Sequence, residues 1–147
     1  MRKLNRFALK ITILFFIFFN IEVNSKTVSL GESDSKITIK VFSSLTCPAC
    51  ANFHSKIFSN LKKDFIDKGL VRFEHHPFPL DLAALNAEII LRCYVDKDKK
   101  FALLDKIYEK QQLWAVGSDI NKINDSIKKI GLEVNLENEK MDGCLKN

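Results

Sequence analysis

The stretch SSLTCPACANFH, residues 43–54, contains two of the four cysteines of this 147-residue chain, Cys47 and Cys50. Two residues, Pro48 and Ala49, separate them. A pair with this spacing serves as a structural disulfide, as half of a zinc site, or as a reactive redox centre. The segments on either side of the pair, and the compartment in which the protein works, distinguish these three uses.

The stretch lies between a predicted strand and a predicted helix. Residues 37–42, ITIKVF, alternate and are rich in β-branched side chains, which is typical of a strand. After the cysteines, apolar residues recur at every fourth position, which predicts a long helix with one buried stripe: Phe53, Ile57, Leu61 and Phe65. A second strand is predicted at residues 70–75, after a helix stop at Gly69. Two strands joined by a helical crossover form a β-α-β unit and pair in parallel.

The first 25 residues have the layout of a signal peptide. A basic segment at residues 1–6 precedes the apolar run ITILFFIFF at residues 11–19, and small residues follow at 23–25. The apolar run is shorter than the ~20 residues that span a membrane. We therefore expect cleavage near Ser25, with an uncleaved membrane anchor as the alternative.

Most of the net positive charge of the chain comes from this targeting segment. Without residues 1–25 the formal net charge falls from +5 to +2, and no Lys/Arg stripe with interleaved aromatic residues remains. The sequence therefore argues against nucleic-acid binding. An exported protein meets an oxidising environment in which disulfides persist, and four cysteines allow three different pairings.

The second half of the chain is predicted to be entirely helical, because no later run alternates or is rich in β-branched residues. Asp81 is expected to cap the first of these helices, and residues 96–100 to form a charged, solvated turn. The third helix is expected to lie between Ser118 and Gly131. The expected buried positions are Leu82, Leu85, Ile89 and Cys93, then Phe101, Leu104 and Tyr108, then Ile120, Ile123, Ile127 and Ile130, and finally Leu136, Met141, Cys144 and Leu145.

The position of the cysteine pair favours redox chemistry. Pro48 suits the first turn of a helix, which places Cys47 at the helix N-terminus and Cys50 one turn inside. The positive end of the helix dipole lowers the pKa of a thiol in the first position. We expect Cys47 to be the exposed nucleophile and Cys50 the resolving thiol of an exchange cycle that passes through a mixed disulfide.

Other uses of the pair remain open at this point. Zinc normally needs a second pair of ligands, and His54 offers only a third ligand beside Cys47 and Cys50. A non-catalytic metal-binding module, or a degenerate truncated one, is therefore the alternative function. A reductase or isomerase would use the same two cysteines and differ only in redox potential and partner.

These residues resemble the DsbA-type thiol–disulfide oxidoreductases of the thioredoxin superfamily. The resemblance covers residues 28–145 and is strongest in VFSSLTCPACANFH (41–54), VRFEHHPFPLDLAALNAEIILRC (71–93) and QQLW (111–114). It implies an α/β, thioredoxin-like fold with an inserted helical domain. The expected divisions are a signal peptide at 1–25, the N-terminal part of the thioredoxin-like domain at 26–80, and the helical insertion at 81–147.

The resemblance also implies a function. Cys47 would attack, Cys50 would be its partner, and disulfides would pass to reduced, newly exported proteins in the periplasm. A membrane redox partner would reoxidise the pair, and no dissociable cofactor and no metal would be needed. Ala49 departs from the family, whose members commonly carry His at this position. The family's cis-proline loop and the later sheet strands are also absent from the sequence, which suggests a truncated chain.

The remaining cysteines, a histidine pair and the single tryptophan also allow predictions. Cys93 and Cys144 would be either two buried free thiols or, as the exported location and related DsbA-like proteins favour, a second, non-catalytic disulfide. The pair His75-His76 is expected to be exposed at a strand tip, with a wall beside the cysteines or copper ligation as the functional options. Trp114 is expected to pack between helices.

Overall fold

The computed structural model describes residues 27–94 and 96–146 of the chain. Its strands are β1 (Val28–Leu30), β2 (Ile37–Ser43) and β3 (Val71–Pro77), and they form one sheet in the order β1-β3-β2. β2 and β3 run parallel, whereas β1 runs antiparallel to β3. The predicted β-α-β unit with parallel strands is confirmed.

The central strand β3 has one buried and one polar face. Val71, Phe73 and His75 alternate along the buried face, and Arg72 and Glu74 lie between them on the partly exposed face. Buried and partly exposed side chains alternate in this way along a strand that packs against the core on one face only. The buried face of β3 therefore marks the side of the sheet on which the core lies.

The helical crossover between β2 and β3 contains two π-helical stretches. Its parts are α2 (Pro48–Phe53), η1 (His54–Phe58), α3 (Ser59–Leu61) and η2 (Lys62–Ile66). The predicted stripe is wrong at Ile57 and Phe65, which are 54% and 47% exposed, while Phe58 and Ile66 are buried. A π-helical turn closes five residues apart rather than four, so each such turn moves the buried position one residue further along the chain.

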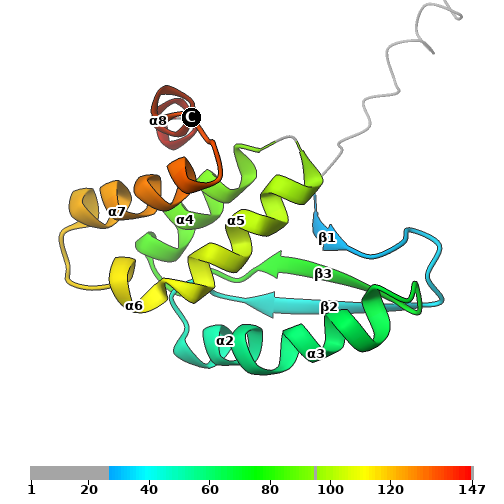
Figure 1. Ribbon diagram of the computed structural model, residues 1–147. Helices are drawn as coiled ribbons and strands as arrows, with labels where there is room; N and C mark the ends of the chain where they lie inside the picture. Colours follow the sequence, from blue (N-terminus) through cyan, green and yellow to red (C-terminus); the bar gives the residue numbers. More distant parts are fainter. Residues whose placement is uncertain (1–26, 95, 147) are drawn as a thin grey trace, which may run out of the picture.

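Five helices follow β3 in residues 82–94 and 96–146. They are α4 (Leu82–Arg92), α5 (Lys97–Glu109), α6 (Gln111–Trp114), α7 (Ile120–Glu133) and α8 (Asn138–Lys146). The sequence predicts helices with four apolar faces here, and α6 is the additional one. Figure 1 shows them gathered beside the sheet, with α5 close to the strands and α8 far from them. This helical layer covers the buried face of β3.

The buried face of α4 differs from the prediction. Asp81 caps the helix as expected, because its Oδ1 accepts a hydrogen bond of 2.7 Å from the Ala84 amide. However, Leu82 and Leu85 are 56% and 43% exposed, and the small side chain of Ala87 is buried instead. Small residues allow α4 to approach its neighbours closely, and tertiary packing therefore overrides the spacing of the larger leucines.

Two helix boundaries also differ from the prediction. Asp96 caps α5 by accepting a hydrogen bond from the Lys99 amide, so residues 96–100 form the N-cap and first turn of a helix rather than a separate turn. Residues 96–99 are exposed to solvent, as expected. α7 continues past Gly131 to Glu133 and is capped by Asp119, not by Ser118. Gly131 serves close packing instead, since a Cβ at this position would lie 2.5 Å from Met141 Sδ.

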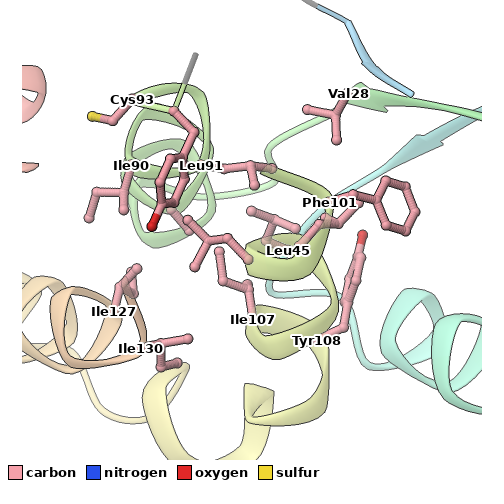
Figure 2. Close-up of a cluster of buried hydrophobic side chains, with 14 of the residues drawn as sticks. Val28, Leu45, Ile90, Leu91, Cys93, Phe101, Ile107, Tyr108, Ile127 and Ile130 are labelled. Carbon is pink, nitrogen blue, oxygen red and sulfur yellow. The ribbon is translucent and has the colours of Figure 1, made fainter. Parts of the chain in front are cut away.

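One hydrophobic core joins the sheet to the helices. Figure 2 shows Leu91 of α4, Ile107 of α5 and Ile127 of α7 within the same cluster as Val28 of β1. Trp114 is 1% exposed and its Nε1–H donates a hydrogen bond of 2.8 Å to the Ile107 carbonyl, so its packing role is confirmed. Most of the other predicted core positions are buried or half-buried: Cys93, Phe101, Leu104, Tyr108, Ile123, Ile130, Leu136, Met141, Cys144 and Leu145.

The targeting segment and the domain boundaries stay predictions. The predicted signal peptide lies outside the described residues, and the division between residues 80 and 81 crosses one continuous core. Among the helices of residues 27–94 and 96–146, none has the length and apolar character that crossing a lipid bilayer requires.

Candidate functional site

The cysteine pair lies where the sequence predicts, at the start of the helix after β2. Cys47 is the N-cap residue of α2, with extended backbone angles, and Pro48 occupies the first turn. The Cys47 sulfur accepts a hydrogen bond from the Cys50 amide at 3.4 Å, and the Cys47 carbonyl accepts one from Ala51 at 3.1 Å. A sulfur thus replaces the side-chain oxygen that usually caps a helix.

The two thiols of the pair have opposite acidities. The Cys50 thiol donates to the Cys47 sulfur, and this contact, together with the amides of Cys50 and Ala49, lowers the pKa of Cys47 below its ordinary value of 9.0. Partial burial is the main cause that raises the pKa of Cys50, and the neighbouring Cys47 raises it further. Both cysteines are free and half-buried. The site therefore holds one sulfur that ionises more readily than an ordinary thiol and one that ionises less readily.

The loop that carries Cys47 is held by the buried side chain of Gln111 and by Asp81, the N-cap residue of α4. Gln111 is 3% exposed, and its Nε2 donates to the carbonyls of Leu45 and Cys47 at 2.8 and 3.0 Å. Thr46 Oγ1 donates to Asp81 Oδ2 at 2.7 Å, which ties the loop to the start of α4. The sequence offered no sign of these roles, because both partners lie more than thirty residues from the cysteines.

A cavity of about 200 Å³ lies behind Cys50, between β2, α2 and α5. Its lining residues are Val41, Phe42, Ser43, Ala49, Cys50, Phe53, His54, Phe73, His75, Leu104 and Tyr108. The prediction that both histidines of His75-His76 are exposed is wrong for His75, which is 1% exposed and forms part of this wall. His76 is half-buried, pairs with Glu74 at 3.0 Å and stacks on Phe42.

His54 has partners other than a metal site. Its Nε2 lies 2.5 Å from Asp105 Oδ1, and its ring stacks on Phe58 at a centroid distance of 4.6 Å. Within residues 27–94 and 96–146, no group of three or more His, Cys, Asp or Glu side chains is arranged to hold a metal ion. His54 is thus engaged by Asp105 and Phe58.

Cys93 and Cys144 form a disulfide with a Cα–Cα distance of 6.2 Å. Cys93 is the C-cap of α4 and is 7% exposed, and Cys144 lies in α8. The bond joins the C-terminal end of α4 to α8, which Figure 1 shows at the edge of the helical layer away from the strands. The two cysteine pairs thus lie in different parts of the fold.

Comparison with known families agrees with this architecture. A family model described as thioredoxin matches residues 23–147. The chain belongs to the thioredoxin family. Its fold is the expected one, a thioredoxin-like α/β arrangement with the cysteine pair at a helix N-terminus and an added helical region.

Two named relatives are similar to most of this chain. A Rickettsia bellii protein named as a protein-disulfide oxidoreductase is 32% identical over 117 residues, which cover 80% of this chain and 44% of that protein. Disulfide bond formation protein D of Bacillus subtilis is 35% identical over 122 residues and 75% of this chain, which correspond to 54% of its own length. The chain thus spans about half the length of these relatives.

The crystal structure of Wolbachia pipientis alpha-DsbA1 has a similar fold. It superimposes with a TM-score of 0.75 and 24% identity over 84% of this chain and 61% of that one. At this identity the likeness supports the fold and not the function. The function is therefore inferred from the geometry of the cysteine pair and from the named relatives.

Proposed function

We propose that this protein is an extracytoplasmic thiol–disulfide oxidoreductase that passes disulfides to reduced exported proteins through Cys47 and Cys50. One observation carries the proposal: the Cys47 sulfur caps α2 and accepts hydrogen bonds from the Cys50 thiol and amide. This arrangement stabilises a thiolate at Cys47, which is the form that enters and leaves disulfides most readily.

The proposed reaction balances without a cofactor. A substrate thiolate attacks the Cys47 sulfur of the oxidised pair, the Cys47–Cys50 bond breaks, and Cys50 takes up a proton. The second substrate thiolate then attacks the substrate sulfur of the mixed disulfide, a bond forms between the two substrate sulfurs, and Cys47 leaves as a thiolate. The substrate loses two electrons, and the cysteine pair gains them. A stabilised leaving thiolate favours this direction, because it lowers the free energy of the reduced enzyme.

The compartment and the partners follow from the same proposal. The basic segment and apolar run of residues 1–25 support export, so the protein would work in the periplasm on newly exported chains. After each cycle the reduced pair would need an oxidant, and we propose a membrane redox partner for this step. The names of the relatives from Rickettsia bellii and Bacillus subtilis support disulfide chemistry of this kind.

The proposal is tested with a reduced peptide that contains two cysteines. The oxidised wild-type protein is expected to close the peptide disulfide and to become reduced in equal amount. When the peptide is supplied in its disulfide form, Cys47 of Cys50→Ser attacks one peptide sulfur and the other peptide sulfur leaves as a thiolate. The peptide–Cys47 mixed disulfide is expected to accumulate, detectable by mass spectrometry, because the resolving thiol is missing. Peptide oxidation that survives Cys47→Ser, or a mixed disulfide at another cysteine, would contradict the assigned roles.

A further inference from the structure

Four buried polar side chains form a continuous hydrogen-bonded chain behind the cysteines. Tyr108 OH donates to Ser43 Oγ at 2.9 Å, Ser43 Oγ lies 3.0 Å from His75 Nδ1, and His75 Nε2 lies 2.5 Å from Glu88 Oε1. The four residues come from α5, β2, β3 and α4, and none is more than 6% exposed. We call these four residues the buried relay. The proposed disulfide exchange gives none of them a role so far.

With neutral His75 carrying its hydrogen on Nε2, the hydrogen bonds of the buried relay have one direction. Tyr108 occupies an acceptor position of Ser43, so the Ser43 hydrogen is available for His75 Nδ1. His75 then donates its Nε2 hydrogen to the Glu88 carboxylate. Burial is the main cause that raises the pKa of Tyr108, so its phenol stays protonated as a donor. Every hydrogen therefore points from the cavity towards Glu88.

The buried relay can accept one proton at the Tyr108 oxygen, the end opposite Glu88. A proton that reaches the Tyr108 oxygen displaces the Tyr108 hydrogen to Ser43, and Ser43 passes its own hydrogen to His75 Nδ1. The resulting imidazolium remains paired with Glu88, whose second oxygen lies 3.5 Å from Arg92 Nε. A carboxylate that orients a histidine and stabilises its charged form is a familiar arrangement in acid–base catalysis.

The buried relay and Cys50 border one cavity. Tyr108, Ser43 and His75 line the same 200 Å³ cavity as Cys50. A cavity of this size with polar groups in its wall has room for water that would connect the thiol to the phenol. Because burial raises the pKa of Cys50, this thiol needs a proton acceptor when it attacks and a donor when it leaves.

We propose that the buried relay of Tyr108, Ser43, His75 and Glu88 exchanges a proton with the Cys50 thiol during disulfide exchange. The inference rests on the proposed function. When a mixed disulfide at Cys47 is resolved, Cys50 gives its proton to the relay and its sulfur attacks the Cys47 sulfur. The Cys47–Cys50 bond forms, the bond to the substrate sulfur breaks, and the substrate leaves as a thiolate. In the opposite direction, the relay returns the proton to Cys50.

Other ionisable groups border the relay. Cys50 of α2 borders the same cavity, and Arg92 approaches Glu88 from the next turn of α4. His54 of η1 contacts the Tyr108 ring at a centroid distance of 4.8 Å and is itself paired with Asp105. His75 and Tyr108 act on the reacting sulfurs only through Cys50, and they are therefore positioning residues.

The test isolates the step that depends on Cys50. A fluorescent thiol is first attached to Cys47 as a mixed disulfide, and its release by Cys50 is followed at several pH values. His75→Gln keeps hydrogen-bonding groups but carries no titrating nitrogen, and Tyr108→Phe keeps the ring but lacks the hydroxyl. The matched control is Tyr94→Phe, which removes the hydroxyl of another buried tyrosine, whose partner is the Val134 carbonyl.

Loss of a positioned proton acceptor is expected to slow release by about a hundredfold. Below the pKa of Cys50, release in His75→Gln and Tyr108→Phe should rise about tenfold for each pH unit, since only thiolate formed by solvent reacts. The wild type and Tyr94→Phe should show a flatter profile. A merely structural role would lower stability without changing this slope.

The outcomes separate the two proposals. If Tyr108→Phe and His75→Gln release the label with the rate and pH profile of the wild type, the relay is wrong and the disulfide exchange stands. If Tyr94→Phe is slowed equally, the effect is structural and the relay is again wrong. If no mixed disulfide forms at Cys47, the proposed function itself fails. Should His75→Gln not fold, Tyr108→Phe alone decides.

Discussion

The two cysteine pairs of this chain differ in their spacing, their surroundings and their bonding state. Cys47 and Cys50 are three positions apart at the start of α2 and are free. Cys93 and Cys144 are 51 positions apart and are joined by a disulfide. The first pair is half-buried beside a cavity, whereas Cys93 is 7% exposed at the end of α4.

The difference shows that surroundings, and not the residue, decide what a cysteine does. At the N-cap of α2, hydrogen-bond donors lower the pKa of Cys47, which favours exchange. Between α4 and α8, the two sulfurs are joined in a disulfide, with Cys93 in the hydrophobic core and Cys144 packed against it. We therefore expect the first pair to govern activity and the second to govern stability.

The largest expected effect is on activity and sharpens this division. Cys47→Ser should lower peptide oxidation by about a thousandfold or more, as in other enzymes that lose a covalent nucleophile. The measurement is the initial rate of disulfide formation in the test peptide. The double variant Cys93→Ala/Cys144→Ala is the control, and its activity per folded molecule should equal that of the wild type. A comparable loss in the control would remove the distinction between the pairs.

The next effect is on the free energy of unfolding. The chain-entropy estimate gives about 4 kcal/mol for a disulfide that closes a loop of this length. Denaturant unfolding of Cys93→Ala/Cys144→Ala should show a loss of this order, whereas Cys47→Ser should leave the unfolding midpoint almost unchanged. Equal midpoints for the double variant and the wild type would show that the bond contributes no stability.

A smaller effect tests the packing that brings α8 to its disulfide partner. Gly131→Ala places a Cβ against the fully buried Met141, and overpacking of this kind costs about 1–3 kcal/mol. The control is Gly143→Ala in α8, where the added Cβ meets nothing within 4 Å. A gain of about 0.5–1 kcal/mol is expected there from helix propensity. Similar unfolding midpoints for the two variants would contradict the close contact between α7 and α8.

The smallest effect concerns the acidity of Cys47. Cys50→Ala removes the thiol that is the first cause of the lowered pKa, so the pKa of Cys47 should rise towards its ordinary value of 9.0. The backbone amides remain and should keep part of the shift. The pH dependence of the iodoacetamide alkylation rate measures this change, and an unchanged midpoint would assign the whole shift to the backbone.

The same lowered pKa predicts the pH dependence of the reduced protein. Because the folded state favours the Cys47 thiolate, it binds fewer protons at this sulfur than the unfolded chain does. The stabilisation is complete above the ordinary thiol pKa, and it is lost as the pH falls through the lowered pKa of the folded protein. Reduced Cys47→Ser should lack this dependence in unfolding measurements.

Local signals in the sequence were reliable where one interaction decides the structure. The proline after Cys47, the strand before it and Asp81 before α4 predicted a strand, two helix starts and an N-cap cysteine. Each of these features depends on neighbours within four residues of the chain. The positions of Cys47 and Cys50 followed from the same stretch, whereas the family resemblance also used residues 71–93 and 111–114.

Features that depend on distant contacts were missed. Ile57 and Phe65 are exposed because π-helical turns displace the buried stripe to Phe58 and Ile66. His75 lies in β3, which continues to Pro77. The residues next to it in the sequence do not indicate that Ser43 and Glu88 contact its two ring nitrogens. The spacing of apolar residues records amphipathicity and not the identity of a partner on another element.

By itself, the sequence determined the β-α-β unit, the cysteine at a helix start and the helical second half, because backbone propensity and capping act over a few residues. Only the tertiary structure decided which sulfurs are joined, how Gln111 holds the Cys47 loop, and that four polar side chains from four elements meet behind Cys50. These contacts form because the core closes around them, and a buried polar group is tolerated only where another element supplies its hydrogen-bond partner.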